Sequence, residues 1–376
     1  MRSTDIARVF DAPGPFLSLY LATGGGLENA GPRVELRWKN VRGELLERGV
    51  PEGLLEAVDP LVEGSHTAGA TLAVLASAGG VAWSGSLPDP PLREAVARWG
   101  PLPSIVPLLA HAQSQVPHVA VLASRAAAEL AARTPDSDRG EQVEVEGERS
   151  PYLTRSAPGG WSQPRYQHRA EVIWERNAAE VAEVLTDMVD RVRPRFVAVA
   201  GDVRAVQFLR DKSPKRVRKR MKVVGGELPS IETVLEEAAK LVHATVERDA
   251  DELLDRFEEG QAQHDRAADG AAATLRALAR AQVETLLVVD EPGDERSAWF
   301  GGGGERIAMD RDTLLAIGEV APAEGRLVDV AVRAALTTGA GVRVLGPGTT
   351  RPGTTGSGTG RGPREGLGAL LRFATS

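Results

Sequence analysis

The feature that most constrains the fold is an amphipathic helix followed at once by an apolar strand near the middle of the chain. Apolar residues at 178, 181, 185, 188 and 192 are spaced three or four apart, which predicts a helix with one apolar face. The apolar run at residues 196–200 is typical of a buried strand, and a similar run precedes the helix at residues 119–122. This rhythm of strand, helix and strand predicts an α/β layer fold.

The rest of this middle segment yields more local predictions. We expect an alanine-rich helix at residues 126–132 and a short alternating strand at residues 143–145. A loop rich in glycine, serine, proline and arginine is predicted at residues 155–169. Asn177 followed by Glu180 predicts a capping-box start for the helix that comes next.

The first segment also has an α/β pattern. Apolar runs at residues 16–21 and 71–75 predict strands, and the polar stretch at residues 34–49 between them is compatible with a helix. Six prolines lie within residues 87–107, which indicates a boundary zone. We therefore predict a first domain at residues 1–105.

The third segment begins after Pro229. An apolar stripe at residues 231–242 and an acidic stretch at residues 249–259 predict two successive helices, and the acidic one either faces solvent or shields a basic partner. Two helix-then-strand pairs follow, which predicts a small α/β/α sandwich; its strand residues Leu286 and Val288 are expected in the core. The pairs are residues 270–282 with 285–289, and residues 327–338 with 342–345. The Gly/Thr-rich tract at residues 346–362 is expected to be looped.

Several classes of chemistry are excluded or unsupported. The chain has no cysteine, which excludes disulfides, thiol catalysis and cysteine-based metal sites. Its six histidines show no metal-ligand spacing, and no phosphate-binding lysine motif is present, so we predict neither a metal nor a cofactor. Residues 1–8 lead into no long apolar stretch, so we expect a soluble cytoplasmic protein without a membrane span.

The net charge of −7 hides one dense cationic segment. Four of the six lysines and three arginines fall within eleven residues. Because phosphates respond to local potential, this segment can bind a polyanion although the whole chain is acidic. The alternative is a solvated basic loop. The candidate RNA-binding residues are Lys212, Lys215, Arg216, Arg218, Lys219, Arg220 and Lys222.

A second candidate site lies in the loop before the helix. Gly159 and Gly160 permit backbone conformations and close approaches that other residues do not. Arginine and aromatic side chains nearby suit contacts with RNA phosphates and unstacked bases. The alternative is an ordinary surface loop whose tryptophan packs on its own domain. The candidate RNA-contacting residues of the loop are Arg155, Trp161, Arg165 and Arg169.

A glycine pair and a glutamine on a loop that leads into an amphipathic helix, in the middle of three α/β segments, point to a known family. The chain resembles bacterial members of the archaeal and eukaryotic release-factor and Pelota superfamily. It is similar to actinobacterial release-factor-like proteins, near the Balon hibernation factors and the Vms-type peptidyl-tRNA hydrolases. The resemblance implies a divergent N-terminal α/β domain for the decoding region (1–105), an RNase H-like middle domain (106–229) and an L30e-like C-terminal domain (230–376).

The glutamine motif departs from that of true release factors. Release factors carry Gly-Gly-Gln, whereas this chain has Gly159-Gly160-Trp161-Ser162-Gln163, which is closer to the G-x-S-Q form of the Vms-type enzymes. The resemblance implies that Gln163 positions water at the peptidyl-tRNA ester, with Gly159, Gly160 and Ser162 shaping the loop. Residues 1–105 contain no recognisable codon-reading motif, which argues against sense-specific termination.

Three functions remain open at this stage. The first is occupancy of the ribosomal A site, in hibernation or in the rescue of stalled ribosomes. The second is hydrolysis of peptidyl-tRNA with Gln163, and the third is RNA binding or processing away from the ribosome. The resemblance also implies contact of residues 230–376 with a translational GTPase such as elongation factor Tu.

Overall fold

The structure is a computed structural model, and it describes most of the chain. The described residues are 8–23, 30–67, 71–87, 95–135, 140–147, 163–225, 230–263, 266–289, 291, 293–346 and 361–373. Their contacts divide the chain into two compact units. The first, called unit 1, joins Met1–Gln113 to Asp249–Ser376, and the second, unit 2, is Ser114–Arg248. The three-domain boundaries inferred from the resemblance stay a prediction.

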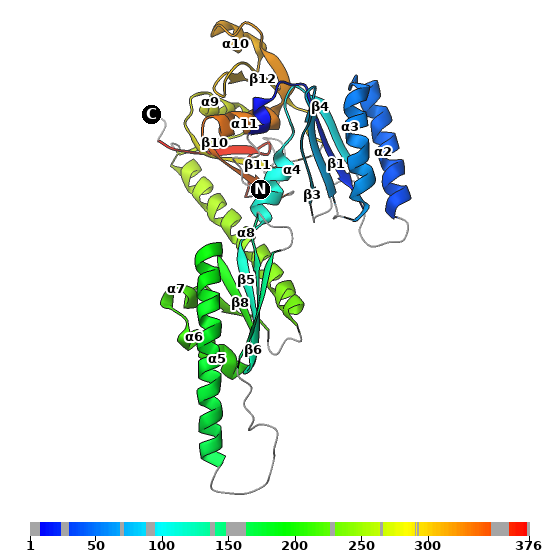
Figure 1. Ribbon diagram of the computed structural model, residues 1–376. Coiled ribbons are helices and arrows are strands. Elements are labelled where there is room, and N and C mark those ends of the chain that lie inside the picture. Colours follow the sequence, from blue (N-terminus) through cyan, green and yellow to red (C-terminus); the bar gives the residue numbers. More distant parts are fainter. Residues whose placement is uncertain are drawn as a thin grey trace. The chain divides into compact units, whose positions relative to one another are not determined.

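Unit 2 contains a five-stranded mixed sheet of order β7-β6-β5-β8-β9 (Figure 1). β5, β6 and β7 pair in antiparallel fashion, whereas β8 is parallel to β5 and β9 is parallel to β8. This topology is consistent with the RNase H-like layout that the resemblance implies. The strands are β5 (His118–Ala123), β6 (Ala127–Arg133), β7 (Glu141–Glu146), β8 (Phe196–Gly201) and β9 (Met221–Val223).

Helices cover both faces of this sheet because successive strand side chains point to opposite faces. Val119 and Val121 of β5 share a core with the predicted apolar stripe of α5 (Gln163–Val192) and with α6 (Val203–Lys212). Ala120 instead contacts the cluster that contains the first part of α8 (Ile231–Ala262). The amphipathic helix and the strands predicted at residues 119–122, 143–145 and 196–200 are therefore confirmed.

Three predictions in unit 2 are wrong. The alanine-rich segment expected as a helix is strand β6, because pairing with both β5 and β7 outweighs the helix propensity of alanine. The loop expected to reach residue 169 is already helical from Gln163, so Asn177 and Glu180 lie inside α5 rather than at its start. The first turns of α5 carry no apolar stripe, so periodicity did not reveal them.

The two helices predicted after Pro229 are one continuous helix, α8. No proline or glycine interrupts residues 231–259, so the change from an apolar stripe to an acidic stretch does not end the helix. Its apolar residues up to Val242 pack on the sheet of unit 2, and Leu254 and Phe257 pack on the C-terminal sheet. Three acidic side chains near its end pair with Arg361: they are Asp251 and Asp255, which are exposed, and Glu258, which is half-buried.

The N-terminal part of unit 1 is an antiparallel sheet of order β3-β2-β1-β4. Helices α2 and α3 cover one of its faces. The proline-rich stretch expected to be a boundary holds β4, the edge strand of this sheet, which pairs with β1. The elements are η1 (Arg8–Asp11), β1 (Phe16–Ala22), α2 (Ala30–Glu47), α3 (Glu52–Glu63), η2 (Gly64–Thr67), β2 (Thr71–Ser77), β3 (Gly80–Leu87), β4 (Ala95–Gly100) and α4 (Val106–Ser114).

The C-terminal part of unit 1 has a sheet of order β10-β16-β11-β15, and Leu286 and Val288 are fully buried in it, as predicted. α9 and α11 cover one face and the end of α8 covers the other, which confirms an α/β/α sandwich. A small sheet, β13-β12-β14, and α10 lie beside it. The elements are β10 (Ala267–Asp269), α9 (Ala271–Ala279), β11 (Val283–Val289), β12 (Ser297–Phe300), β13 (Ile307–Ala308), α10 (Arg311–Ala316), β14 (Ala323–Arg326), α11 (Leu327–Thr337), β15 (Gly341–Leu345) and β16 (Leu367–Leu371).

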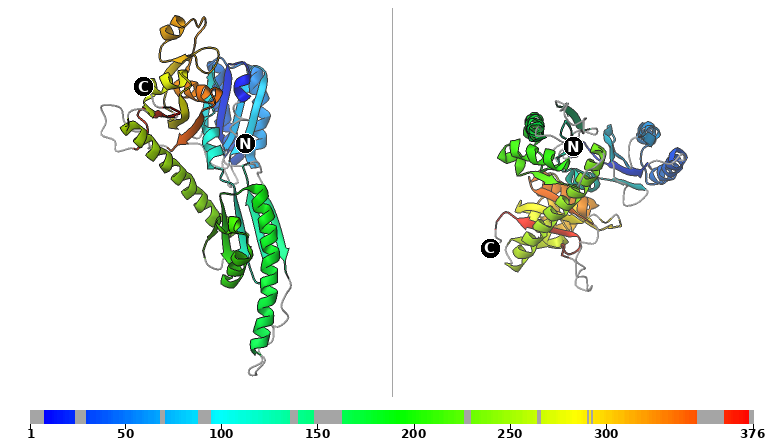
Figure 2. Two further views of the ribbon diagram at one scale, coloured as in Figure 1. Left: turned by 90° about the vertical axis from the view of Figure 1, so that its left-hand side faces the viewer. Right: turned by 90° about the horizontal axis from the view of Figure 1, so that it is seen from below.

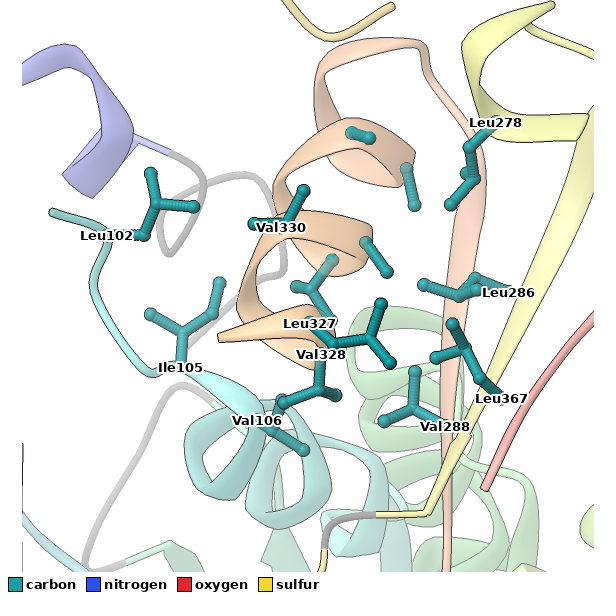
Figure 3. Packing of buried hydrophobic residues seen from close by; sticks show 14 of the residues in the cluster. Leu102, Ile105, Val106, Leu278, Leu286, Val288, Leu327, Val328, Val330 and Leu367 are labelled. Carbon is teal, nitrogen blue, oxygen red and sulfur yellow. The ribbon is translucent and has the colours of Figure 1, made fainter. Parts of the chain in front are cut away.

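The two parts of unit 1 share one hydrophobic core. Figure 3 shows Leu102, Ile105 and Val106 beside the residues of α11. The amide of Gln113 also donates to the carbonyl of Val342 at 2.7 Å and accepts from the N–H of Val344 at 2.9 Å. Most of the Gly/Thr-rich tract lies outside the described residues. None of the helices in the described ranges has the length and hydrophobicity that a bilayer span needs.

Candidate functional site

The N-terminal part of α5 projects beyond the sheet that the rest of the helix covers (Figures 1 and 2). None of residues 171–176 is buried, and the first buried position of the described side chains on α5 is Asn177. Gln163 begins the helix fourteen residues earlier. At about 1.5 Å of rise per residue, it lies roughly 21 Å further along the helix axis.

Most of the predicted glutamine motif falls outside the described residues. This applies to Gly159, Gly160, Ser162 and the loop residues Arg155 and Trp161. Gln163, Arg165 and Arg169 lie in the first turns of α5, where only the backbone is described. The roles of all these residues therefore stay predictions. The structure describes the helix that carries Gln163, Arg165 and Arg169.

A cluster at the base of the projecting helix joins α5 to the neighbouring elements. The guanidinium of Arg125 lies 4.6 Å from the ring centroid of Trp174 on α5 and 2.9 Å from the carboxylate of Asp202. Asp202 caps α6 by accepting from the backbone N–H groups of Arg204 at 3.0 Å and Ala205 at 3.1 Å. Burial acts to raise the pKa of Asp202, but the bonds from Arg125 and these two N–H groups outweigh it, so the pKa is lowered.

Gly201 makes this arrangement possible at the end of β8. Its φ of +128° is a conformation that other residues rarely adopt, and an added Cβ would lie 1.9 Å from the carbonyl oxygen of Ala123. The next residue, Asp202, donates its N–H to that same carbonyl at 3.0 Å. Sequence reasoning did not find this cluster, although a strand that ends in glycine and aspartate before a helix is an N-cap signal.

Some cations of the basic segment form ion pairs with carboxylates of the same protein. Lys212 lies 3.1 Å from Glu175, and Arg216 lies 2.7 Å from Asp190, both of them on α5. Arg204 of α6 pairs with Glu171 in the projecting part of the same helix. The hydrogen bond and charge of Arg216 lower the pKa of Asp190, and Asp190 raises that of Arg216. These pairs hold α6 and α7 (Lys215–Arg218) alongside α5.

Two further cations of the segment have partners within unit 2. Arg220 donates from Nε to the carbonyl of Pro194 at 3.0 Å and from a terminal nitrogen to the carbonyl of Arg216 at 2.9 Å. The ammonium of Lys222 lies 5.4 Å from the centroid of the Phe196 ring. Both side chains therefore have a structural role on the sheet edge, beside any role in binding.

Lys215, Arg218 and Lys219 are different, because they are exposed and have no ion pair with any residue that the structure describes. The short helix α7 is anchored by Val217, which is fully buried in the core of unit 2. This anchor turns the three neighbouring cations toward solvent. The predicted basic segment thus contains two kinds of cation. Some interact with other residues of unit 2, and three are available to bind an anion.

The described side chains offer no group of three or more histidine, aspartate or glutamate residues that could hold a metal ion. A small pocket does lie in unit 2, at the base of the projecting helix. Alanine side chains make up much of its wall, and Arg125, Gly147, Trp174 and Asn177 also line it.

Comparison with known families gives this geometry its context. Residues 117–263 match the model of bacterial archaeo-eukaryotic release factor family 2. The matched segment begins at β5 and ends with α8, so it contains the whole sheet of unit 2 and the projecting helix. Over this segment the chain is similar to the bacterial archaeo-eukaryotic release factors. The release-factor-like segment therefore carries both candidate sites predicted from the sequence.

Relatives of the whole chain are also found. Two uncharacterized proteins of Mycobacterium tuberculosis, from strains CDC 1551 and H37Rv, are each 26% identical over all of this chain and 98% of their own length. Among solved structures, archaeal release factor aRF1 matches with 17% identity, a TM-score of 0.25 and coverage of 98% of this chain and 96% of its own.

Two other solved structures show the same kind of distant likeness. Archaeoglobus fulgidus Pelota has 18% identity and a TM-score of 0.37, and the match covers 81% of this chain and 84% of that one. Saccharomyces cerevisiae Dom34 has 12% identity and a TM-score of 0.39 over 77% and 76% of the two chains. TM-scores of this size do not establish a shared arrangement of the whole chains.

Proposed function

We propose that this protein is a translation factor of the release-factor and Pelota type that binds the ribosomal A site during hibernation or rescue of stalled ribosomes. The observation that carries the proposal is the match of residues 117–263 to a release-factor family. Within that segment, α5 holds Gln163 at the tip of a projecting helix. Such an element suits entry into a narrow site in RNA, and a ribosome-binding role implies a cytoplasmic location.

The charge distribution of unit 2 supports the same proposal. Lys215, Arg218 and Lys219 are exposed and can contact ribosomal RNA phosphates, whereas Lys212 and Arg216 are paired with carboxylates of α5. Phosphate contacts of this kind release counterions, so they make binding dependent on salt.

Co-sedimentation with vacant 70S ribosomes over a range of salt concentrations tests the proposal. We expect binding that weakens steeply with salt. Replacing Lys215, Arg218 and Lys219 together by glutamine should reduce the slope of log affinity against log salt by roughly three, about one for each lost phosphate contact. The matched control, Lys212→Gln with Arg216→Gln, should change this slope much less. A protein that binds free RNA but no ribosomes would support the third function and overturn this one.

A second function, hydrolysis of peptidyl-tRNA, is favoured by the position of Gln163 as the first residue of α5. In this reaction a water molecule attacks the ester carbon, the peptide leaves with a carboxyl group, and the tRNA regains its terminal hydroxyl. Glutamine has no basic group at neutral pH, so Gln163 would orient this water by hydrogen bonding, and the peptidyl-tRNA would be the substrate.

Release of labelled peptide from ribosomes that carry peptidyl-tRNA separates hydrolysis from occupancy. The hydrolase hypothesis predicts that the wild-type protein releases peptide, and that Gln163→Ala abolishes release without weakening co-sedimentation. No release from a ribosome complex confirmed by co-sedimentation would exclude hydrolysis and leave A-site occupancy. Contact of residues 230–376 with a translational GTPase such as elongation factor Tu is part of the same proposal, and a pull-down with the purified GTPase tests it.

A further inference from the structure

The turn that joins α5 to β8 contains an arginine in a backbone conformation that favours glycine. α5 ends at Val192, and the N–H of the next residue, Arg193, donates to the carbonyl of Val189 at 2.9 Å. The φ of Arg193 is +51°. A residue that ends a helix in this way is usually glycine, because a Cβ is unfavourable in the left-handed region.

The turn requires this backbone conformation, but the described contacts do not require an arginine side chain. The chain places glycine at most such positions: among the described residues, ten glycines and three other residues have a positive φ. The side chain of Arg193 is exposed and forms no ion pair with any residue that the structure describes. A favourable positive charge near the C-terminus of α5 is already supplied by Arg191 in its last turn. Strain that is kept at an exposed position without a structural partner indicates a functional role.

The turn that carries Arg193 is held against the basic segment of unit 2. The guanidinium of Arg216 lies 2.7 Å from the carboxylate of Asp190 in the last turn of α5. The Nε of Arg220 donates to the carbonyl of Pro194, the residue after Arg193, at 3.0 Å. These two contacts bring a fourth exposed cation next to the segment that carries the three described above.

We propose that Arg193 is a further phosphate-binding residue, which extends the surface formed by Lys215, Arg218 and Lys219 and contacts the backbone of RNA. Exposed cations that come from two segments of one surface suit a chain of phosphates, whose negative charges are spread along a strand, better than a single small anion. That the RNA is ribosomal rests on the proposed function, whereas phosphate binding by Arg193 does not.

Replacing Arg193 by glycine in the full-length protein separates binding from folding, because glycine removes the strain and the cation together. We expect Arg193→Gly to lower the equilibrium constant for urea unfolding by about threefold, since relief of the strain outweighs the greater freedom that glycine gives the unfolded chain. The slope of log affinity for purified ribosomal RNA against log salt, measured by filter binding, should fall by about one.

Two further variants serve as controls. Arg193→Lys keeps the charge and should keep the salt slope. Ala281→Gly relieves a similar positive φ, +52°, in unit 1, so it should stabilise the protein and leave RNA binding unchanged.

The same variants are compared in co-sedimentation with 70S ribosomes. Lower stability of Arg193→Gly would show that the fold needs the arginine, and would overturn the proposal. An unchanged salt slope for RNA would overturn it as well, even if the variant bound an acidic polypeptide such as polyglutamate less tightly. A wild type that binds RNA through Arg193 but does not bind ribosomes would contradict the proposed function and leave phosphate binding by Arg193 supported. A wild type that binds neither would overturn both.

Discussion

The charge state of His118 links one residue to the stability of unit 2. The imidazole stacks on Phe196 with ring centroids 5.4 Å apart, and its Nδ1 lies 2.8 Å from the carbonyl of Val116. Burial lowers the pKa of His118 below its ordinary value of 6.5. The hydrogen bond with Val116 opposes this shift, and the charge of Arg133 on the neighbouring strand adds to it. The folded protein therefore keeps this ring neutral at a pH where the unfolded chain protonates it.

This shift predicts a loss of stability in mild acid. The unfolded chain binds more protons below pH 6.5, so the stabilisation is complete above that value and is lost as the pH falls toward the lower folded pKa. Urea unfolding at pH 7.5 and pH 5.5 measures the difference. His118→Gln should reduce the dependence on pH, and His243→Gln, at an exposed position on α8, is the control for losing a histidine. Equal pH dependence in the wild type and His118→Gln would contradict the prediction.

At the scale of elements, the last strand has a central place. β16 lies between β10 and β11 in the C-terminal sheet and pairs with both in antiparallel fashion. All five of its residues are buried. Only its pairing with strands that lie roughly eighty to one hundred residues earlier in the chain shows that it completes a sheet.

Removing this strand should unfold unit 1. Leu367, Leu370 and Leu371 are each at least 94% buried, and burying a leucine contributes about 2 kcal/mol. Their combined loss of about 6 kcal/mol is comparable with the net stability of a typical protein, roughly 5–15 kcal/mol. A chain ending at Arg364 should therefore lose the cooperative unfolding of unit 1, measured by calorimetry. A chain ending at Arg372 keeps β16 and is the control, because Phe373 is exposed. A normal unfolding transition in the shorter chain would contradict this account.

At the scale of the whole molecule, the two units differ in how their cores are built. The clusters of unit 2 are formed entirely by residues between Val116 and Val242. The largest cluster of unit 1 instead combines residues from both ends of the chain, including Ile105 and Val106 with Val330 and Ala331. Folding of the N-terminal sheet thus depends on residues more than two hundred positions away.

Separate expression of segments tests this difference. Residues 114–248 should fold cooperatively on their own, because their sheet is covered on both faces within the segment. Residues 1–113 should not, since the sheet face that carries Tyr20 and Leu75, together with Ile105 just before α4, would lose its C-terminal cover and be exposed to water. Circular dichroism and binding of a hydrophobic dye distinguish the two outcomes. A compact, cooperative fragment 1–113 would show that the shared core is dispensable.

Local sequence patterns predicted the elements whose buried residues recur at a regular spacing along the chain. The stripe of α5 and the apolar runs of β5, β8 and β11 were readable because helix and strand periodicities are properties of neighbouring residues. β6 was not, since its alanines favour a helix when taken alone and form a strand only through its neighbours β5 and β7. The polar first turns of α5 and the unbroken course of α8 were missed for a similar reason, because the absence of an apolar stripe does not end a helix.

For the candidate sites too, some features could be predicted from the sequence and others depended on the tertiary structure. The sequence alone determined the order of strands and helices, the glycine pair ahead of Gln163 and the basic segment, since composition and spacing are local. Only the tertiary structure decided which cations are free, because Lys212 and Arg216 meet carboxylates of α5 that lie 37 and 26 residues away. It also placed Asn177 inside α5, buried and bonded to the carbonyl of Arg125, rather than at a helix cap, because burial and hydrogen-bond partners depend on segments that meet only after folding.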